Sequence, residues 1–93
     1  MDEIVYCVSY DLRKSDRNYN DLYTAIKSFG TWWHQTESVW FVKSTNRESS
    51  TIREYLKQFI DENDLLFVIR VENNWAGFGF SKEEYNWLHN NLK

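Results

Sequence analysis

Residues 31–41 read "TWWHQTESVWF" and hold three of the five tryptophans of the chain. This stretch joins two runs rich in β-branched and aromatic residues, 32–36 and 38–44, across a short polar junction. The pattern predicts a β-hairpin. Because neighbouring residues of a strand point to opposite faces of a sheet, Trp32 and Trp33 are expected on opposite faces.

Two further runs predict the strands that accompany the hairpin. The run "IVYCVSYDL" at 4–12 is apolar and β-rich, and a polar loop follows it. The nearly continuous apolar run "DLLFVIRV" at 64–71 is typical of a strand that is covered on both faces or lies at a subunit contact. The sequence therefore predicts four strands.

Apolar residues at spacings of three and four predict two amphipathic helices between these strands. The first covers 19–29 and ends at Gly30, a residue that favours the left-handed position after a helix. The second covers 52–60, and Thr51 with Glu54 has the spacing of a capping box at its start.

The order βαββαβ is that of the ferredoxin-like split sandwich, an α+β fold. In this fold an antiparallel sheet with strand order 4-1-3-2 carries both helices on one face. We expect residues 1–71 to form this core. The segment 72–93 is expected to belong to the same single domain, as an aromatic extension that ends in a short helix.

The start of that last helix has a double signature. Ser81 and Glu84 have the spacing of a capping box. Phe80 and Tyr85 occupy the two positions of a hydrophobic staple around the same helix start.

Two helices cover only one face of such a sheet, so the second face needs another cover. On the first strand the small and polar set is expected there, namely Cys7, Ser9 and Asp11. On the last strand the matching set is expected to be Leu66, Val68 and Arg70. Because such a face is too apolar for water, we predict a twofold homodimer built on it.

The bulk composition limits the classes of protein. The formal net charge is −3, so any contact with nucleic acid must be local. Cys7 is the only cysteine, which excludes an internal disulfide, and the two histidines lie far apart, which excludes a structural zinc pattern. The sequence has no apolar run of about 18 residues and no signal peptide, so we expect a soluble cytoplasmic protein with no membrane partner.

The predicted topology gathers acidic and basic side chains at one end of the sheet. The acids are Asp11, Asp64, and Glu37 beside Ser38, and the adjoining loop holds Arg13, Lys14 and Arg17. Carboxylates suit Mg²⁺ or Mn²⁺, and basic side chains suit the phosphate that such a metal would hold. The plainer alternatives are that Asp11 and Asp64 are turn residues and that the basic loop is solvated.

The aromatic residues form a second candidate surface, either for a ligand or for the dimer contact. Its members are Trp32, Trp33, His34, Trp40 and Trp75. The tryptophan on the second face would stack in the dimer or on a base or nucleotide ring. His34 is either an acid–base group or an edge residue that packs. Trp75 and Phe78 flank the glycines at 77 and 79, where they dock the tail or close over a ligand.

The stretches "VSYDL" at 8–12, "SFG" at 28–30 and "ESVWFV" at 37–42, set in the βαββαβ order, resemble the CRISPR-associated protein 2 family and its SinR-like relatives. The hairpin with "WWH" and "ESVW" is more similar to the relatives. The resemblance covers about residues 4–71 and implies a ferredoxin-fold homodimer. CRISPR members of the family help to integrate DNA, and some are reported as metal-dependent nucleases. In them an aspartate at the end of the first strand pairs across the dimer axis as the proposed metal ligand, a position that Asp11 occupies here.

Two classes of function follow from the sequence. The first is a nucleic-acid-associated protein that binds RNA or DNA, with metal-dependent endonuclease activity at paired copies of Asp11 as one option. The second is a non-catalytic module that binds a nucleotide, a cyclic nucleotide or a protein partner, as a regulator or sequestering protein in antiviral defence would. The resemblance favours the first class, whereas the low positive charge and the many rings favour the second.

Overall fold

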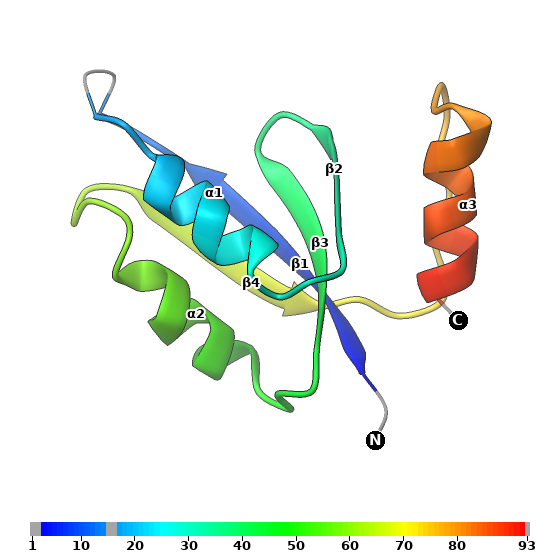
Figure 1. Ribbon diagram of the computed structural model, residues 1–93, viewed down its shortest axis with the longest axis horizontal. Coiled ribbons are helices and arrows are strands. Elements are labelled where there is room, and N and C mark those ends of the chain that lie inside the picture. Colours follow the sequence, from blue (N-terminus) through cyan, green and yellow to red (C-terminus); the bar gives the residue numbers. More distant parts are fainter. Residues whose placement is uncertain (1–2, 15–16, 93) are drawn as a thin grey trace.

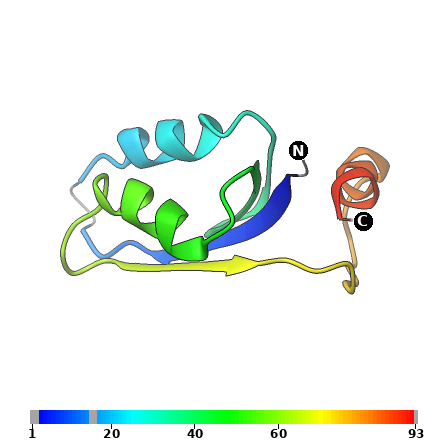
Figure 2. The same cartoon turned by 90° about the horizontal axis from the view of Figure 1, so that it is seen from below.

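The computed structural model describes residues 3–14 and 17–92. Its elements are β1 (Ile4–Asp11), α1 (Asn20–Lys27), β2 (Trp32–Thr36), β3 (Val39–Ser44), α2 (Ser49–Lys57), β4 (Leu65–Arg70) and α3 (Lys82–Asn91). The strands form one antiparallel sheet in the order β2-β3-β1-β4, and α1 and α2 lie together on one face of it (Figures 1 and 2). The predicted α+β ferredoxin-like fold and its strand order are confirmed.

The main core lies between the sheet and these two helices. Tyr6 and Val8 of β1 are completely buried, because alternate residues of that strand point toward the helices. The helices contribute their apolar stripes, namely Leu22, Ala25 and Ile26 from α1 and Ile52 and Leu56 from α2. Trp40 of β3 completes this core at 2% exposure, and its indole Nε1 donates a hydrogen bond of 2.9 Å to the Tyr10 hydroxyl.

The second face is partly covered by the segment after β4. Figure 1 shows α3 beyond β2, apart from α1 and α2. Trp33 of β2 is only 5% exposed and stacks on Phe41 at a centroid distance of 5.1 Å. Its indole Nε1 donates a hydrogen bond of 3.2 Å to the carbonyl of Glu84 in α3. Trp32 and Trp33 therefore point to opposite faces as predicted, but the chain itself covers Trp33.

The start of α3 agrees with its sequence signature. The Glu84 backbone N–H donates to the Ser81 hydroxyl at 3.2 Å, and the Ser81 backbone N–H donates to the Glu84 carboxylate at 2.6 Å. The rings of Phe80 and Tyr85 meet edge to face at 5.6 Å. Both the capping box and the hydrophobic staple are confirmed.

The capping box predicted for the second helix is wrong. α2 begins at Ser49, two residues before Thr51, and its N-cap Glu48 makes no side-chain cap hydrogen bond. Glu54 instead pairs with Arg53 at 3.0 Å and with Lys57 at 3.7 Å. The helix is held by the burial of its apolar stripe, which outweighs the missing cap.

The face assigned to β4 must also be corrected. Ser9 pairs with Phe67 and Cys7 pairs with Ile69, and directly opposed residues of an antiparallel pair share one face. The exposed set of β4 is therefore Leu65, Phe67 and Ile69, at 52%, 61% and 50% exposure, whereas Leu66 and Val68 pack against the helix-side core. A shift of one residue exchanges the two faces of a strand, which is why the predicted set was the wrong one.

Among the residues that the structure describes, no helix has the length and hydropathy needed to cross a bilayer.

Candidate functional site

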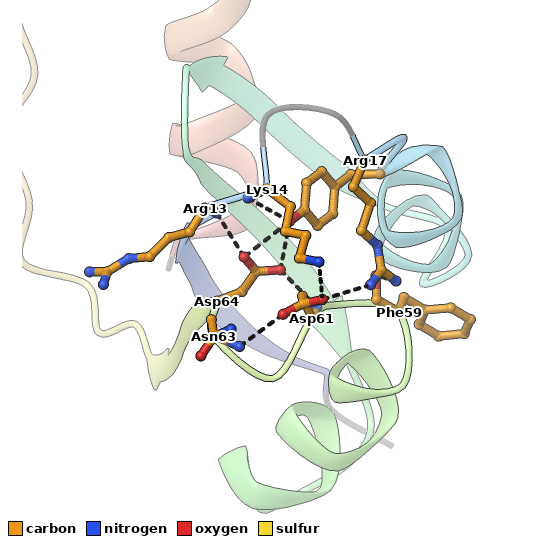
Figure 3. A network of polar contacts seen from close by, with 8 residues as sticks. Arg13, Lys14, Arg17, Phe59, Asp61, Asn63 and Asp64 are labelled. Carbon is orange, nitrogen blue, oxygen red and sulfur yellow. Dashed lines mark hydrogen bonds and ion pairs between the residues drawn. The ribbon is translucent and has the colours of Figure 1, made fainter.

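A polar network joins the loop after β1 to the loop before β4, and Asp64 lies at its centre (Figure 3). The Asp64 side chain is 9% exposed. Its Oδ1 accepts a hydrogen bond from the Arg13 backbone N–H at 2.7 Å, and its Oδ2 accepts one from the Asp61 backbone N–H at 2.8 Å. The Tyr19 hydroxyl points at both oxygens, at 3.0 and 2.8 Å. Asp64 thus ties two loops to the start of α1.

The surroundings of Asp64 decide its charge state. Burial by itself would raise the pKa of the carboxyl, but the hydrogen bonds from Arg13, Asp61 and Tyr19 and the nearby charge of Arg17 outweigh it. The pKa of Asp64 therefore lies below its usual value, and the side chain is ionised at neutral pH. Burial, and then the hydrogen bond to this carboxylate, raise the pKa of Tyr19, so its hydroxyl keeps its proton.

Asp61 receives the basic side chains of the loop. Its Oδ2 lies 3.7 Å from both Lys14 Nζ and Arg17 Nη1. Arg17 also donates to the Phe59 carbonyl at 3.3 Å, and its guanidinium lies over the Tyr19 ring at 5.3 Å from the centroid. Two of the three predicted phosphate-binding residues are therefore held by the protein's own carboxylate.

Asp11 lies at the edge of this network and is open to solvent. Its side chain is 62% exposed, and Oδ2 is 3.2 Å from Nη2 of Arg13. An exposed ion pair of this kind contributes only about 0–1 kcal/mol. Taken together, the three carboxylates of Asp11, Asp61 and Asp64 balance the three cations of the loop, and these six side chains carry no net charge.

The described residues of a single chain do not fit a divalent metal ion. No three His, Cys, Asp or Glu side chains gather there in a group that would hold one. Both oxygens of Asp64 are already taken by hydrogen bonds. The turn with Glu37 does reach this end of the sheet, because the Tyr10 backbone N–H donates to the Ser38 carbonyl at 3.2 Å, but Glu37 is not part of the network.

The aromatic residues do not form one surface. Trp33 and Trp40 are buried within the chain, at 5% and 2% exposure, which corrects the expectation that they line a ligand or dimer surface. His34 stacks on the Trp40 ring at 3.7 Å, as an edge residue that packs would. Trp32 is 38% exposed beside α1, with Lys27 Nζ 5.2 Å from its ring centroid.

The aromatic residues of the tail divide in the same way. Trp75 packs against the cluster around Trp33, so it docks the tail on the sheet. Phe78 is 97% exposed, so it does not contribute to that docking.

The exposed part of the second face is an apolar strip, which we define as Leu65, Phe67 and Ile69 of β4. It lies on the edge strand of the sheet and beside the half-buried Cys7 and Ser9 of β1. Burial raises the pKa of the Cys7 thiol, so this side chain is an inert neighbour rather than a nucleophile.

Sequence reasoning missed two members of the network, Tyr19 and Asp61. Tyr19 was assigned to the apolar stripe of a helix, whereas its hydroxyl serves the network. The stretch "DEND" at 61–64 indicates such a role for Asp61, because an aspartate side chain often accepts a hydrogen bond from the backbone N–H two residues later. The Asn63 backbone N–H donates to Asp61 Oδ1 at 3.1 Å in this way.

These features define the chain as a small ferredoxin-like α+β protein with an acidic residue at the end of its first strand. Residues 4–77 match the family model of CRISPR associated protein Cas2. This match spans most of the 93 residues, and the chain belongs to that family. The predicted resemblance to the CRISPR-associated protein 2 family is confirmed. No solved structure matches the chain.

Proposed function

We propose that the protein works as a homodimer that associates with nucleic acid, and that the apolar strip of β4 forms the dimer contact. The observation that carries this proposal is the exposure of Leu65, Phe67 and Ile69, each at half or more of its surface, in one line on an edge strand. Contiguous apolar surface of this kind marks a protein contact. A twofold contact is self-complementary, so one strip suffices for both copies.

The same contact would include the acidic residue at the end of β1. Asp11 pairs in register with Leu65 and therefore belongs to the strip's face of the sheet. A divalent cation such as Mg²⁺ or Mn²⁺ would draw on carboxylates from two copies of Asp11, because the described residues of one chain contain no group of three ligands. Metal-dependent cleavage of RNA or DNA is therefore assigned only to the dimer.

The basic side chains beside Asp11 offer a contact for phosphate. Arg13 and Lys14 have side chains that are 53% and 51% exposed, and their ion pairs at 3.2 and 3.7 Å are of the weak surface kind. Such pairs can be exchanged for phosphate at small cost. The neutral charge balance of the network supports a modest affinity rather than a tight one.

The test combines association with cleavage. Sedimentation velocity is expected to give a dimer, and labelled single-stranded RNA and DNA are incubated with Mg²⁺, with Mn²⁺ or with a chelator. Metal-dependent cleavage is expected to disappear in Asp11→Asn and to persist in Asp21→Asn, a matched variant of an exposed acid on α1. Cleavage that survives in Asp11→Asn would remove the role of Asp11, and a monomer at every concentration would remove the dimer.

The charge balance of the network also favours a second candidate, a non-catalytic binding module for a nucleotide-like small molecule. A neutral surface does not concentrate a polyanion, whereas a small aromatic ligand needs no positive field. Thermal-shift measurements against nucleosides and nucleotides test this candidate. The absence of any shift would count against it.

A further inference from the structure

We propose that the hollow between the segment after β4 and α3 is a binding site for a nucleobase. The hollow has a volume of about 670 Å³, within the range of roughly 300–1,000 Å³ that is usual for ligand sites. Its principal walls are Asn73, Asn74 and Trp75 on the segment and Tyr85 and His89 on α3. This inference goes beyond the proposed dimer and gives the second candidate function a site.

The rings of the hollow suit a flat ligand. Trp75 and His89 have centroids 5.1 Å apart and planes inclined at 57°, so they form a corner rather than a closed stack. A planar heterocycle can lie against one ring and meet the edge of the other. Stacking on aromatic side chains is the usual way in which proteins bind unpaired bases.

The polar groups of the hollow suit the edge of such a ring. No hydrogen bond joins another described residue to the side chains of Asn73, Asn74, Tyr85 or His89, so their polar atoms are open to a ligand or to water. An amide side chain offers both a donor and an acceptor, which matches the mixed donors and acceptors of a base.

The residues that line the hollow favour binding of the base of a nucleotide over binding of its phosphate. No Lys, Arg, Asp or Glu is among the described residues that line the hollow. Among these described lining residues a phosphate group would find no lysine or arginine, so the affinity is expected to come from the ring and its edge. The hollow therefore takes the neutral part of a nucleoside, or an unpaired base of a single strand whose phosphates remain in solvent.

The wall of the hollow is firmly held. A Cβ atom at Gly77 would come within 3.2 Å of Phe80 and of Tyr85, so the segment runs in close contact with the start of α3 and only glycine fits without a shift. Trp75 is anchored in the cluster around Trp33. A preformed wall lowers the ordering cost of binding.

The experiment is a titration of the full chain with adenosine, followed by ¹H–¹⁵N correlation spectra. We expect shifts at the Trp75 indole and at the amides of Asn73 and Asn74, no shifts with ribose, and nearly equal affinities for adenosine and its monophosphate. Asn74→Ala is expected to weaken binding about 5-fold, the effect of one hydrogen bond. Asn90→Ala, an exposed asparagine of α3 outside the hollow, is the matched control and is expected to change nothing.

A second variant tests the ring. Trp75→Leu is expected to weaken binding by about 5- to 100-fold through loss of stacking, while well-dispersed spectra report that the chain is folded. If a short single-stranded oligoadenylate binds more tightly than adenosine, the natural ligand of the site is a nucleic-acid strand. If the two bind equally, the ligand is the free nucleoside. Phe67→Ser and Asp11→Asn are expected to leave adenosine binding unchanged. A negative result for the dimer or for cleavage can therefore be distinguished from a negative result for the nucleobase site.

Two outcomes would overturn the inference. One is the absence of shifts around Trp75 with adenosine up to its solubility limit. The other is a monophosphate that binds much more tightly than adenosine while Asn74→Ala has no effect, because the ligand would then be recognised by its phosphate elsewhere.

Discussion

Replacement of Phe67 by serine tests the dimer contact at its most exposed apolar side chain. Phe67 is 61% exposed in the single chain, and complete burial of a phenylalanine contributes about 1.5–3 kcal/mol. Covering the exposed part of one ring therefore contributes about 1–2 kcal/mol. A twofold dimer loses this contribution from both copies, which amounts to about 2–4 kcal/mol and weakens the dimer by roughly 30- to 700-fold.

The assay is sedimentation equilibrium over a range of protein concentrations. Phe78→Ser is the matched control, because it makes the same substitution at a ring that is 97% exposed and lies outside the strip. The control is expected to keep the wild-type dissociation constant. The reasoning is refuted if Phe67→Ser keeps that constant within about threefold, or if the unchanged protein is still a monomer at about 0.1 mM.

Three further predictions concern the network and the tail. Asp64→Asn is expected to lower the free energy of unfolding at pH 7 by about 1–3 kcal/mol, because hydrogen bonds to a buried carboxylate are lost. The pKa of Asp64 is lower in the folded than in the unfolded chain, so the stability that its carboxylate contributes is complete above the unfolded pKa of about 4 and disappears as the pH falls through the folded pKa. In urea titrations the difference in unfolding free energy between the wild type and the variant is therefore expected to shrink in acid. A difference that stays constant with pH would contradict this prediction. Arg13→Gln is expected to leave the melting temperature nearly unchanged, since an exposed ion pair contributes about 0–1 kcal/mol. The same substitution is expected to reduce the salt dependence of nucleic-acid binding by about one phosphate contact per copy. Unchanged salt dependence in filter-binding measurements would exclude this phosphate contact. Trp33→Ala is expected to lower the free energy of unfolding by about 3–5 kcal/mol and to release α3 from the sheet. Hydrogen exchange is then expected to rise in α3 before it rises in β1. Equal protection of α3 in the wild type and the variant would show that the docking of α3 does not need this ring.

The candidate site was predictable in its location but not in its internal bonding. The strand order brings the end of β1 beside the start of β4, so Asp11, Asp64 and the basic loop are expected at one end of the sheet. The pairing of charges depends on side-chain geometry that no spacing rule contains. Tyr19 illustrates this point, because the same residue both continues the apolar stripe of a helix and places its hydroxyl on Asp64.

The element order, the strand order and the opposite orientation of Trp32 and Trp33 could be predicted without coordinates, because hydrophobic periodicity and chain connectivity are local properties. The exposed residues of β4 could not be predicted in this way, because a shift of one residue exchanges the faces of a strand and the partner strand sets the register. The tail covers Trp33 and leaves Phe67 exposed, a result of three-dimensional packing, because the path of the tail depends on where its apolar residues find partners on the sheet.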